Sequence, residues 1–373
     1  MKSALLPGIA PSRFIGRYWQ KKPLLLRQAL PGFHGLLEPR DLMRLACRND
    51  TQARLVIRHG RRWELRHGPF RPADFRRLPP AGWTLLVQEV NHVLPGAERL
   101  LRAFSFIPYA RLDDVMVSYA PDGGGVGPHF DSYDVFLLQG LGRRRWRISA
   151  QRDHELVPGA PLRILKRFRA EQEWVLEPGD MLYLPPDYAH HGTAVGDCMT
   201  YSIGFRAPSS QELVHGFLDY LTETLAVPGM YRDPDLALPR EPARIDGAML
   251  EKVARTLARV NWKPSDVAQF LGRHLSEPKP HVVFRRPARP RVRAQLCAAC
   301  RSRGLVLDPR TGMLHAGRTI FVNGEAYRIA SRGALAQLKR LANLRALPPC
   351  SPDAEAVPLL YQWYRDGYIR PSP

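Results

Sequence analysis

The sequence has few cysteines and no long apolar segment, and each shortage excludes a class of protein. Five cysteines in 373 residues are too few and too scattered to stabilise a secreted disulfide scaffold. No run of about 18 apolar residues is present, so we expect no membrane-spanning helix. The apolar run before Pro7 is too short for a secretory signal. These absences predict a globular protein of the cytoplasm.

Acidic residues are also scarce relative to basic ones. The chain has 55 Lys and Arg against 35 Asp and Glu, a formal net charge of +20. A surface this basic favours phosphate-rich partners such as ribosomal RNA or the ribosome. The same charge is also explained by an arginine-rich composition with a solvated surface and no such partner. Contact with rRNA is therefore one of two interpretations.

The sequence pattern changes twice along the chain and so divides it into three parts. Up to about residue 208, short β-rich runs alternate with Gly, Pro and Asp, which predicts an antiparallel sandwich or barrel. From Ser209 onward apolar residues recur at helical spacing, and we expect further helices over 246–260 and after a Ser265 cap. Pro and Arg then dominate 277–293, a predicted linker, before a small α+β segment with a hairpin turn at Asn323–Gly324.

The β-rich runs that we expect to form strands in the first part are 54–58, 62–66, 84–90, 114–119, 129–138, 143–149, 173–176, 181–184 and 198–205. In the last part we expect strands over 319–322 and 326–329 and helices over 335–344 and 359–364.

His129 and Asp131 stand one residue apart at the start of a predicted strand. Residues i and i+2 of a strand point to the same side, so the two side chains project together. A third ligand from the later segment that ends in His190 and His191 would complete the two-His, one-carboxylate set of non-haem Fe(II) oxygenases. The motif alone arises often by chance, and ordinary core or turn histidines explain it as well.

Arg144 is the second informative residue. Alternation over 143–148 places it on an apolar face with Trp146 and Ile148, and places the other three arginines on the opposite face. A buried cation without a partner is too costly, so Arg144 requires a carboxylate. The distal carboxylate of 2-oxoglutarate suits a planar guanidinium. A salt bridge to a protein Asp or Glu is the alternative.

The runs PHFDSYDVF (128–136), GRRRW (142–146) and YSIGFRAP (201–208) resemble the bacterial JmjC-type ribosomal oxygenases. The resemblance covers essentially the whole chain. It implies an α+β protein with a double-stranded β-helix (cupin or JmjC jelly roll) catalytic domain over 1–208. A helical dimerisation region over 209–276 follows, and then a linker with a winged-helix-like domain over 277–373.

The same resemblance implies that His129, Asp131 and His190 bind Fe(II) and that Arg144 holds 2-oxoglutarate as cosubstrate. His191 follows His190 directly where the family usually has Glu, which leaves the third ligand ambiguous. Thr200 stands where the family has Asn near the cosubstrate, and its hydroxyl is expected to supply part of that hydrogen bonding.

The implied activity is that of a 2-oxoglutarate-dependent dioxygenase, a protein arginine 3-hydroxylase. Its expected substrate is an arginine side chain, at Cβ, of the large-subunit ribosomal protein L-sixteen, and its expected assembly is a homodimer. Because an arginine needs a carboxylate partner, Asp113 and Asp114, or Tyr133, are candidates to recognise the substrate guanidinium. Solvated turn acids are the plain alternative for the two aspartates.

Two other functions fit parts of the sequence. The first is a cupin sensor that regulates nucleic-acid binding through its C-terminal domain, which the basic charge favours and the predicted cosubstrate site of Arg144 disfavours. The second keeps the chemistry but changes the target to a histidine of another ribosomal protein.

Overall fold

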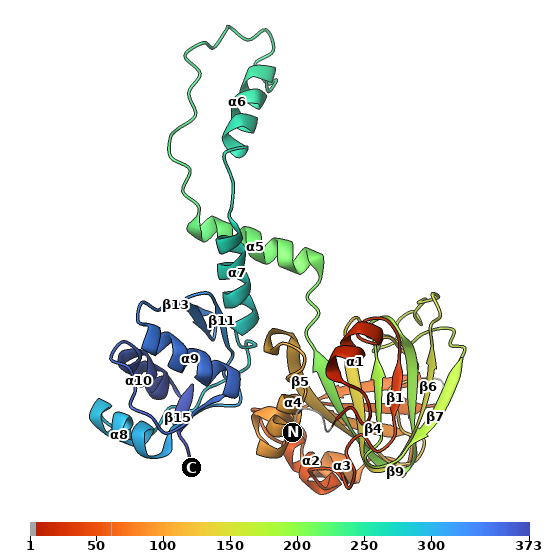
Figure 1. Ribbon diagram of the computed structural model, residues 1–373. Coiled ribbons are helices and arrows are strands. Elements are labelled where there is room, and N and C mark those ends of the chain that lie inside the picture. Colours follow the sequence, from red (N-terminus) through yellow and green to blue (C-terminus); the bar gives the residue numbers. More distant parts are fainter. Residues whose placement is uncertain (1–4, 61) are drawn as a thin grey trace. The chain divides into compact units, whose positions relative to one another are not determined.

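The computed structural model describes residues 5–60 and 62–373, which divide into two compact units (Figure 1). The first unit runs to Ala207 and includes the segments Lys279–Arg285 and Asp308–Arg310. The second unit holds Pro208–Pro278, Arg286–Leu307 and Thr311–Pro373. The helices after residue 208 belong to this second unit together with the C-terminal elements. The three-part division expected from the sequence stays a prediction. Within the described ranges no helix is long and apolar enough to cross a membrane.

The first unit is built on one antiparallel sheet with short helices around it. Its strands are β1 (Leu24–Leu26), β2 (Ala53–His59), β3 (Arg62–His67), β4 (Trp83–Val87), β5 (Leu112–Ala120), β6 (Val135–Ser149), β7 (Gln172–Leu176), β8 (Met181–Leu184) and β9 (Ala189–Phe205). Its helices are α1 (Pro11–Arg17), α2 (Pro39–Ala46), α3 (Pro72–Arg76) and α4 (Pro95–Ala103), with 3-10 turns at Val90–His92 and Tyr109–Arg111. The strand order β1-β8-β6-β9-β5-β4-β2-β3, with β7 also on β6, confirms the predicted antiparallel architecture.

The long strands β6 and β9 pair along most of their length and shape this sheet. β6 joins two runs that the sequence analysis separated, and β9 extends the predicted run 198–205 back to Ala189. Register shifts between Gln139 and Leu141 and between Leu141 and Arg143 interrupt the ladder. Such irregularities bend a strand pair. Side chains from β2, β4, β5, β6 and β9 consequently line one cavity.

The core of the first unit is an aromatic cluster around Phe136 of β6. Its ring centroid lies 4.9 Å from that of Phe104, 5.4 Å from Phe14 and 4.8 Å from Tyr183. All four side chains are completely buried. The neighbours of Phe136 along the strand line the cavity, so this core packs directly behind it.

Short helices occur before residue 208 in addition to the predicted strands. All four α-helices in the described part of this unit begin at a proline, namely Pro11 for α1, Pro39 for α2, Pro72 for α3 and Pro95 for α4. Proline is favoured at the first helical position because its fixed φ suits the helix and its missing N–H has no partner to lose. These prolines were the overlooked signal.

The second unit contains six helices and six strands in its described part. The helices are α5 (Ser210–Thr224), α6 (Gly247–Leu257), α7 (Pro264–Ser276), α8 (Arg293–Arg303), α9 (Arg332–Leu344) and α10 (Ala356–Asp366). The strands β11 (Met313–Ala316), β12 (Thr319–Val322) and β13 (Glu325–Arg328) form one sheet. The strands β10 (Leu305–Leu307), β14 (Ala346–Leu347) and β15 (Ile369–Pro371) form another.

Two local predictions in this unit are confirmed and a third is wrong. Asn323 and Gly324 adopt positive φ and join β12 to β13, as predicted. Ser209 caps α5, and its hydroxyl accepts from the amide of Glu212 at 3.0 Å. The expected Ser265 cap was wrong, because α7 begins one residue earlier at Pro264, a residue suited to the first helical position.

We expect Phe136→Ala to lower the free energy of unfolding by about 3–5 kcal/mol, because it removes a fully buried ring from the cluster. Urea denaturation of the purified protein measures this change. Val157→Ala, at a side chain that is 39% exposed, is the control and should change stability by less than about 0.5 kcal/mol. Equal effects of the two substitutions would contradict the placement of the core.

Candidate active site

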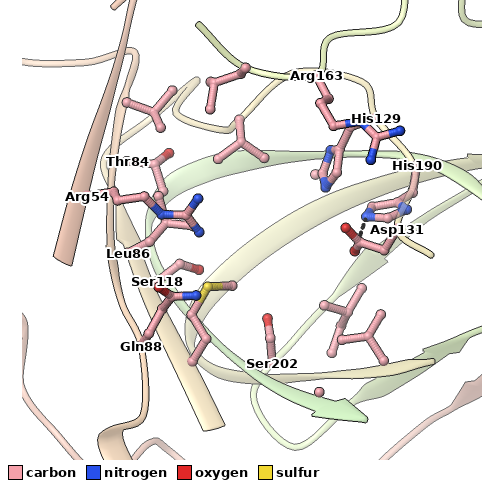
Figure 2. A pocket seen from close by; sticks show the side chains of 18 of the residues that line it. Arg54, Thr84, Leu86, Gln88, Ser118, His129, Asp131, Arg163, His190 and Ser202 are labelled. Carbon is pink, nitrogen blue, oxygen red and sulfur yellow. Dashed lines mark ion pairs between the residues drawn. The ribbon is translucent and has the colours of Figure 1, made fainter. Parts of the chain in front are cut away.

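A cavity of about 540 Å³ lies inside the curved sheet of the first unit. This volume is typical of sites that bind small molecules or side chains. Figure 2 shows His129, Asp131 and His190 together on one side of the cavity, and Arg54 and Thr84 on the opposite side. The first group was predicted from the sequence, and the second was not.

Two backbone hydrogen bonds hold the two histidine segments together. The amide of His129 donates to the carbonyl of His190 at 3.0 Å, and the amide of His190 donates back at 2.7 Å. The amide of Asp187 donates to the carbonyl of Asp131 at 2.8 Å. The prediction that a strand begins at His129 was wrong, because β6 begins at Val135. An isolated bridge to the start of β9 takes its place.

His129, Asp131 and His190 bring one ligand atom each to within 4.8 Å of one another. The Nδ1 atom of His129 lies 3.0 Å from the carbonyl oxygen of Gly127, and that of His190 lies 2.9 Å from the carbonyl of Tyr188. A carbonyl only accepts, so both Nδ1 atoms carry protons and both Nε2 atoms keep free lone pairs. Two imidazoles and a carboxylate oxygen in this arrangement fit one divalent metal ion.

Gly127 explains part of this orientation. Its φ of +79° is a conformation that side chains disfavour. A Cβ at this position would lie 2.6 Å from the Cδ1 atom of Ile164 and 3.0 Å from the ring of Trp63. Only glycine therefore places here the carbonyl that orients His129.

The structure brings His190, rather than His191, to the cluster. Adjacent residues of β9 point to opposite faces, and the Nδ1 atom of His191 accepts from the guanidinium of Arg147 at 2.9 Å. Burial, followed by the nearby His129, lowers the pKa of His190 to about 4. The imidazole is therefore neutral at physiological pH, which is the form that binds a metal.

Arg144 is buried at the cavity without a carboxylate partner. Its Nη1 atom donates to the Ser118 hydroxyl at 3.0 Å and to the Thr200 hydroxyl at 3.2 Å. Its Nε atom and the indole N–H of Trp146 are buried without any hydrogen-bond partner in residues 5–60 and 62–373. No acid of these ranges forms an ion pair with it. The alternative of a salt bridge within the protein is thus not observed there, and the carboxylate of a bound ligand fits the donors.

Thr200 links Arg144 to Gln139 through hydrogen bonds. Its hydroxyl donates to the side-chain oxygen of Gln139 at 2.9 Å while it accepts from Arg144. Thr200 is not among the residues that line the cavity, whereas Ser118 is. Ser118 was not predicted from the sequence, although alternation along β5 could have indicated it once β5 was placed beside β9.

The two predicted aspartates differ sharply in environment, although both line the cavity. The carboxylate of Asp114 is buried and accepts from the backbone amide of Glu89 at 2.9 Å. Burial, followed by the neighbouring Asp113, raises the pKa of Asp114 to about 6. Asp113 lies 3.0 Å from the Lys279 ammonium and 3.6 Å from the Arg206 guanidinium. Its charge is already engaged by protein cations.

Tyr133 also lines the cavity, together with Val135 and Leu137. Tyr133 is 40% exposed, and partial desolvation, followed by the nearby Asp131 carboxylate, raises the pKa of its phenol, which therefore stays protonated and can donate a hydrogen bond.

Comparison with known proteins agrees with this geometry. Residues 99–213 match the JmjC domain family and residues 258–370 match the ROXA-like winged helix family. The chain is 35% identical over 325 residues to the ribosomal protein uL16 3-hydroxylase of Escherichia coli (strain K12), covering 86% of each protein. It is 41% identical over 234 residues to a probable ribosomal oxygenase of Haemophilus influenzae, covering 62% of this chain and 56% of that protein.

Solved structures agree as well. The ribosomal oxygenase YcfD from Escherichia coli matches with a TM-score of 0.84 and 32% identity, over 97% of this chain and 98% of that one. The structure of YcfD in complex with cobalt and 2-oxoglutarate matches with the same TM-score, identity and coverage. The expected fold, a JmjC cupin domain with a C-terminal winged-helix domain, is confirmed.

We expect His190→Ala to abolish stoichiometric Fe(II) binding, because it removes a buried imidazole whose Nε2 lone pair faces the other two ligands. His191→Ala is the matched control and should retain the metal, since that ring contacts Arg147 instead. Anaerobic titration with Fe(II) followed by calorimetry measures both. Loss of metal from the His191 variant alone would contradict this assignment.

Proposed function

The chain belongs to the JmjC ribosomal oxygenases and is an Fe(II)- and 2-oxoglutarate-dependent dioxygenase, and we propose that it hydroxylates an arginine side chain of ribosomal protein uL16 at Cβ. The uL16 protein is the L-sixteen protein expected from the sequence. One observation carries the proposal: the guanidinium of Arg144, buried without a carboxylate partner in the described ranges, shares a cavity with the cluster of His129, Asp131 and His190.

We assign the three clustered side chains to the metal and Arg144 to the cosubstrate. Fe(II) and 2-oxoglutarate, when bound, supply the oxidation of an unactivated carbon by O₂, with release of succinate and CO₂. Three protein ligands leave other positions of the ion open. Arg144 receives the distal carboxylate of 2-oxoglutarate, and Thr200 and Ser118 hold the guanidinium for it.

We assign the substrate guanidinium to Asp114. Its carboxylate faces the cavity from β5 and forms no ion pair in the described ranges, although the charge of Lys279 acts on it from a greater distance, whereas Asp113 forms ion pairs with Lys279 and Arg206. A buried carboxylate favours a guanidinium over a neutral imidazole, so this residue supports an arginine target rather than a histidine. We propose that Tyr133, whose phenol stays protonated, adds a hydrogen bond to the substrate.

The direct test is an assay of the purified enzyme with Fe(II), 2-oxoglutarate, O₂ and uL16. We expect mass spectrometry to find one added oxygen atom on a single arginine, and succinate to form in step with it. No modification, together with tight and salt-sensitive binding of nucleic acid, would favour the cupin-sensor interpretation. Modification of a histidine would contradict the arginine assignment.

We expect Arg144→Met to raise the KM for 2-oxoglutarate by about 30-fold or more, because it deletes one partner of a buried charged pair. Steady-state kinetics at varied 2-oxoglutarate measure it. Arg145→Met is the matched control: this neighbour lies on the opposite face, is exposed, and pairs with Glu173. An unchanged KM in the Arg144 variant would contradict its role.

Substrate affinity should depend on pH through Asp114. With a pKa of about 6, its carboxylate is ionised at pH 7.5 and mostly protonated at pH 5.5, where it no longer attracts a guanidinium. We expect the KM for uL16 to rise about fourfold between these values. Asp114→Asn should raise the KM at pH 7.5 and abolish this pH dependence. If Asp114→Asn kept the wild-type pH dependence of the KM for uL16, another titrating group would cause it.

We propose that the protein is a homodimer held by α6. This helix buries none of its residues, and Leu250, Val253 and Leu257 recur on it at heptad-like spacing with 39–64% exposure. A second copy would cover this stripe, since exposed apolar patches mark interaction surfaces. Light scattering should give twice the 42.3 kDa chain mass for the wild type and one chain mass for Leu250→Asp/Leu257→Asp. A monomeric wild type would contradict the proposal.

The cytoplasmic location and the contact with ribosomal RNA remain predictions. A ribosomal-protein substrate and the net charge of +20 support both.

A further inference from the structure

We propose that Arg54 and Thr84 form a subsite that binds a carbonyl or carboxylate oxygen of the substrate polypeptide beside the residue being hydroxylated. This proposal rests on the proposed function, because it names how the same cavity holds the chain that carries the target arginine.

The subsite lies on two adjacent strands. Arg54 of β2 is paired with Leu86 of β4, and Val56 of β2 is paired with Thr84 of β4. All four side chains line the cavity. Figure 2 shows the Arg54 guanidinium projecting into the cavity from the side opposite His129.

Both polar groups lack the partners that buried groups normally have. The Nε atom of Arg54 and the hydroxyl of Thr84 are inaccessible to solvent, and neither has a hydrogen-bond partner in the described ranges. Thr84 as a whole is 1% exposed. Arg54 forms no ion pair with any acid of those ranges. Since more than about 90% of buried polar groups are hydrogen-bonded, two unpaired groups on one cavity wall indicate that a ligand supplies their partners.

The chemistry of the two side chains defines the ligand atom. A guanidinium has only donors, so its partner is an acceptor oxygen, and a hydroxyl can donate to the same kind of atom. The cosubstrate does not need them, because Arg144 already offers a buried guanidinium on β6. The target guanidinium is excluded as well, since it carries the same charge as Arg54. Main-chain carbonyls and acidic side chains next to the target arginine remain.

Kinetic variants test the subsite on the full-length holoenzyme with uL16. Arg54→Met should raise the KM for uL16 about tenfold or more, and Thr84→Val, which removes only a hydroxyl, about threefold. The KM for 2-oxoglutarate should change less than about twofold in both. Arg54→Lys, which keeps a cationic donor, should recover part of the affinity and serves as the second variant should Arg54→Met not fold.

Arg58→Met is the matched control, because Arg58 lies on the same strand but is exposed and does not line the cavity. Its KM for uL16 should equal that of the wild type. An unchanged KM for uL16 in Thr84→Val and in either Arg54 variant, with an active wild type, would overturn the subsite alone. A parallel rise in the KM for 2-oxoglutarate would overturn it too. A wild type that adds no oxygen to uL16 would overturn the proposed function, and the subsite with it.

Substrate variants distinguish the two sources of oxygen. In a uL16 peptide, each Asp near the target arginine is replaced by Asn and each Glu by Gln, one at a time. The KM of each peptide variant is measured with the wild-type enzyme and with Arg54→Met. One non-additive pair would identify a carboxylate as the partner. Full additivity at every position, with the Arg54→Met effect intact, would identify a main-chain carbonyl.

Discussion

The site depends on the pair of backbone hydrogen bonds between His129 and His190. These bonds join the segment before β6 to the start of β9, so that two imidazoles distant in sequence reach one point. The carbonyls of Gly127 and Tyr188 then set which ring nitrogen faces inward. A metal site built this way is oriented by the backbone before any metal binds, which reduces the cost of assembling it.

The unpaired polar atoms of the cavity outline what the fold is built to bind. Arg144 and Trp146 leave donors open near the metal cluster, while Arg54 and Thr84 leave polar atoms open on the far wall. Each such atom destabilises the folded protein unless a ligand satisfies it. A ligand that forms hydrogen bonds with these atoms removes this cost, and the free energy gained contributes to its binding. This explains why these groups lie together in one cavity, while the aromatic core around Phe136 packs behind it.

Local patterns were enough to find part of the site. The i, i+2 spacing of His129 and Asp131 and the alternation around Arg144 depend on a few adjacent residues. The choice of His190 over His191 needed the register of β9. The contrast between Asp113 and Asp114 depends on Lys279, which returns to the first unit from beyond α7. Arg54 and Thr84 lie in ordinary strand patterns, and only the curvature of the sheet turns them toward the metal cluster.

The central claim is that this cavity couples oxidation of 2-oxoglutarate to hydroxylation of an arginine. Reaction of the Fe(II)-loaded enzyme with uL16 under oxygen-18 gas, followed by mass spectrometry of both products, tests it most directly. The account predicts one labelled oxygen atom on a single arginine of uL16 and one in succinate, in equal amounts. Label in succinate alone, or an arginine oxygen derived from water, would contradict it.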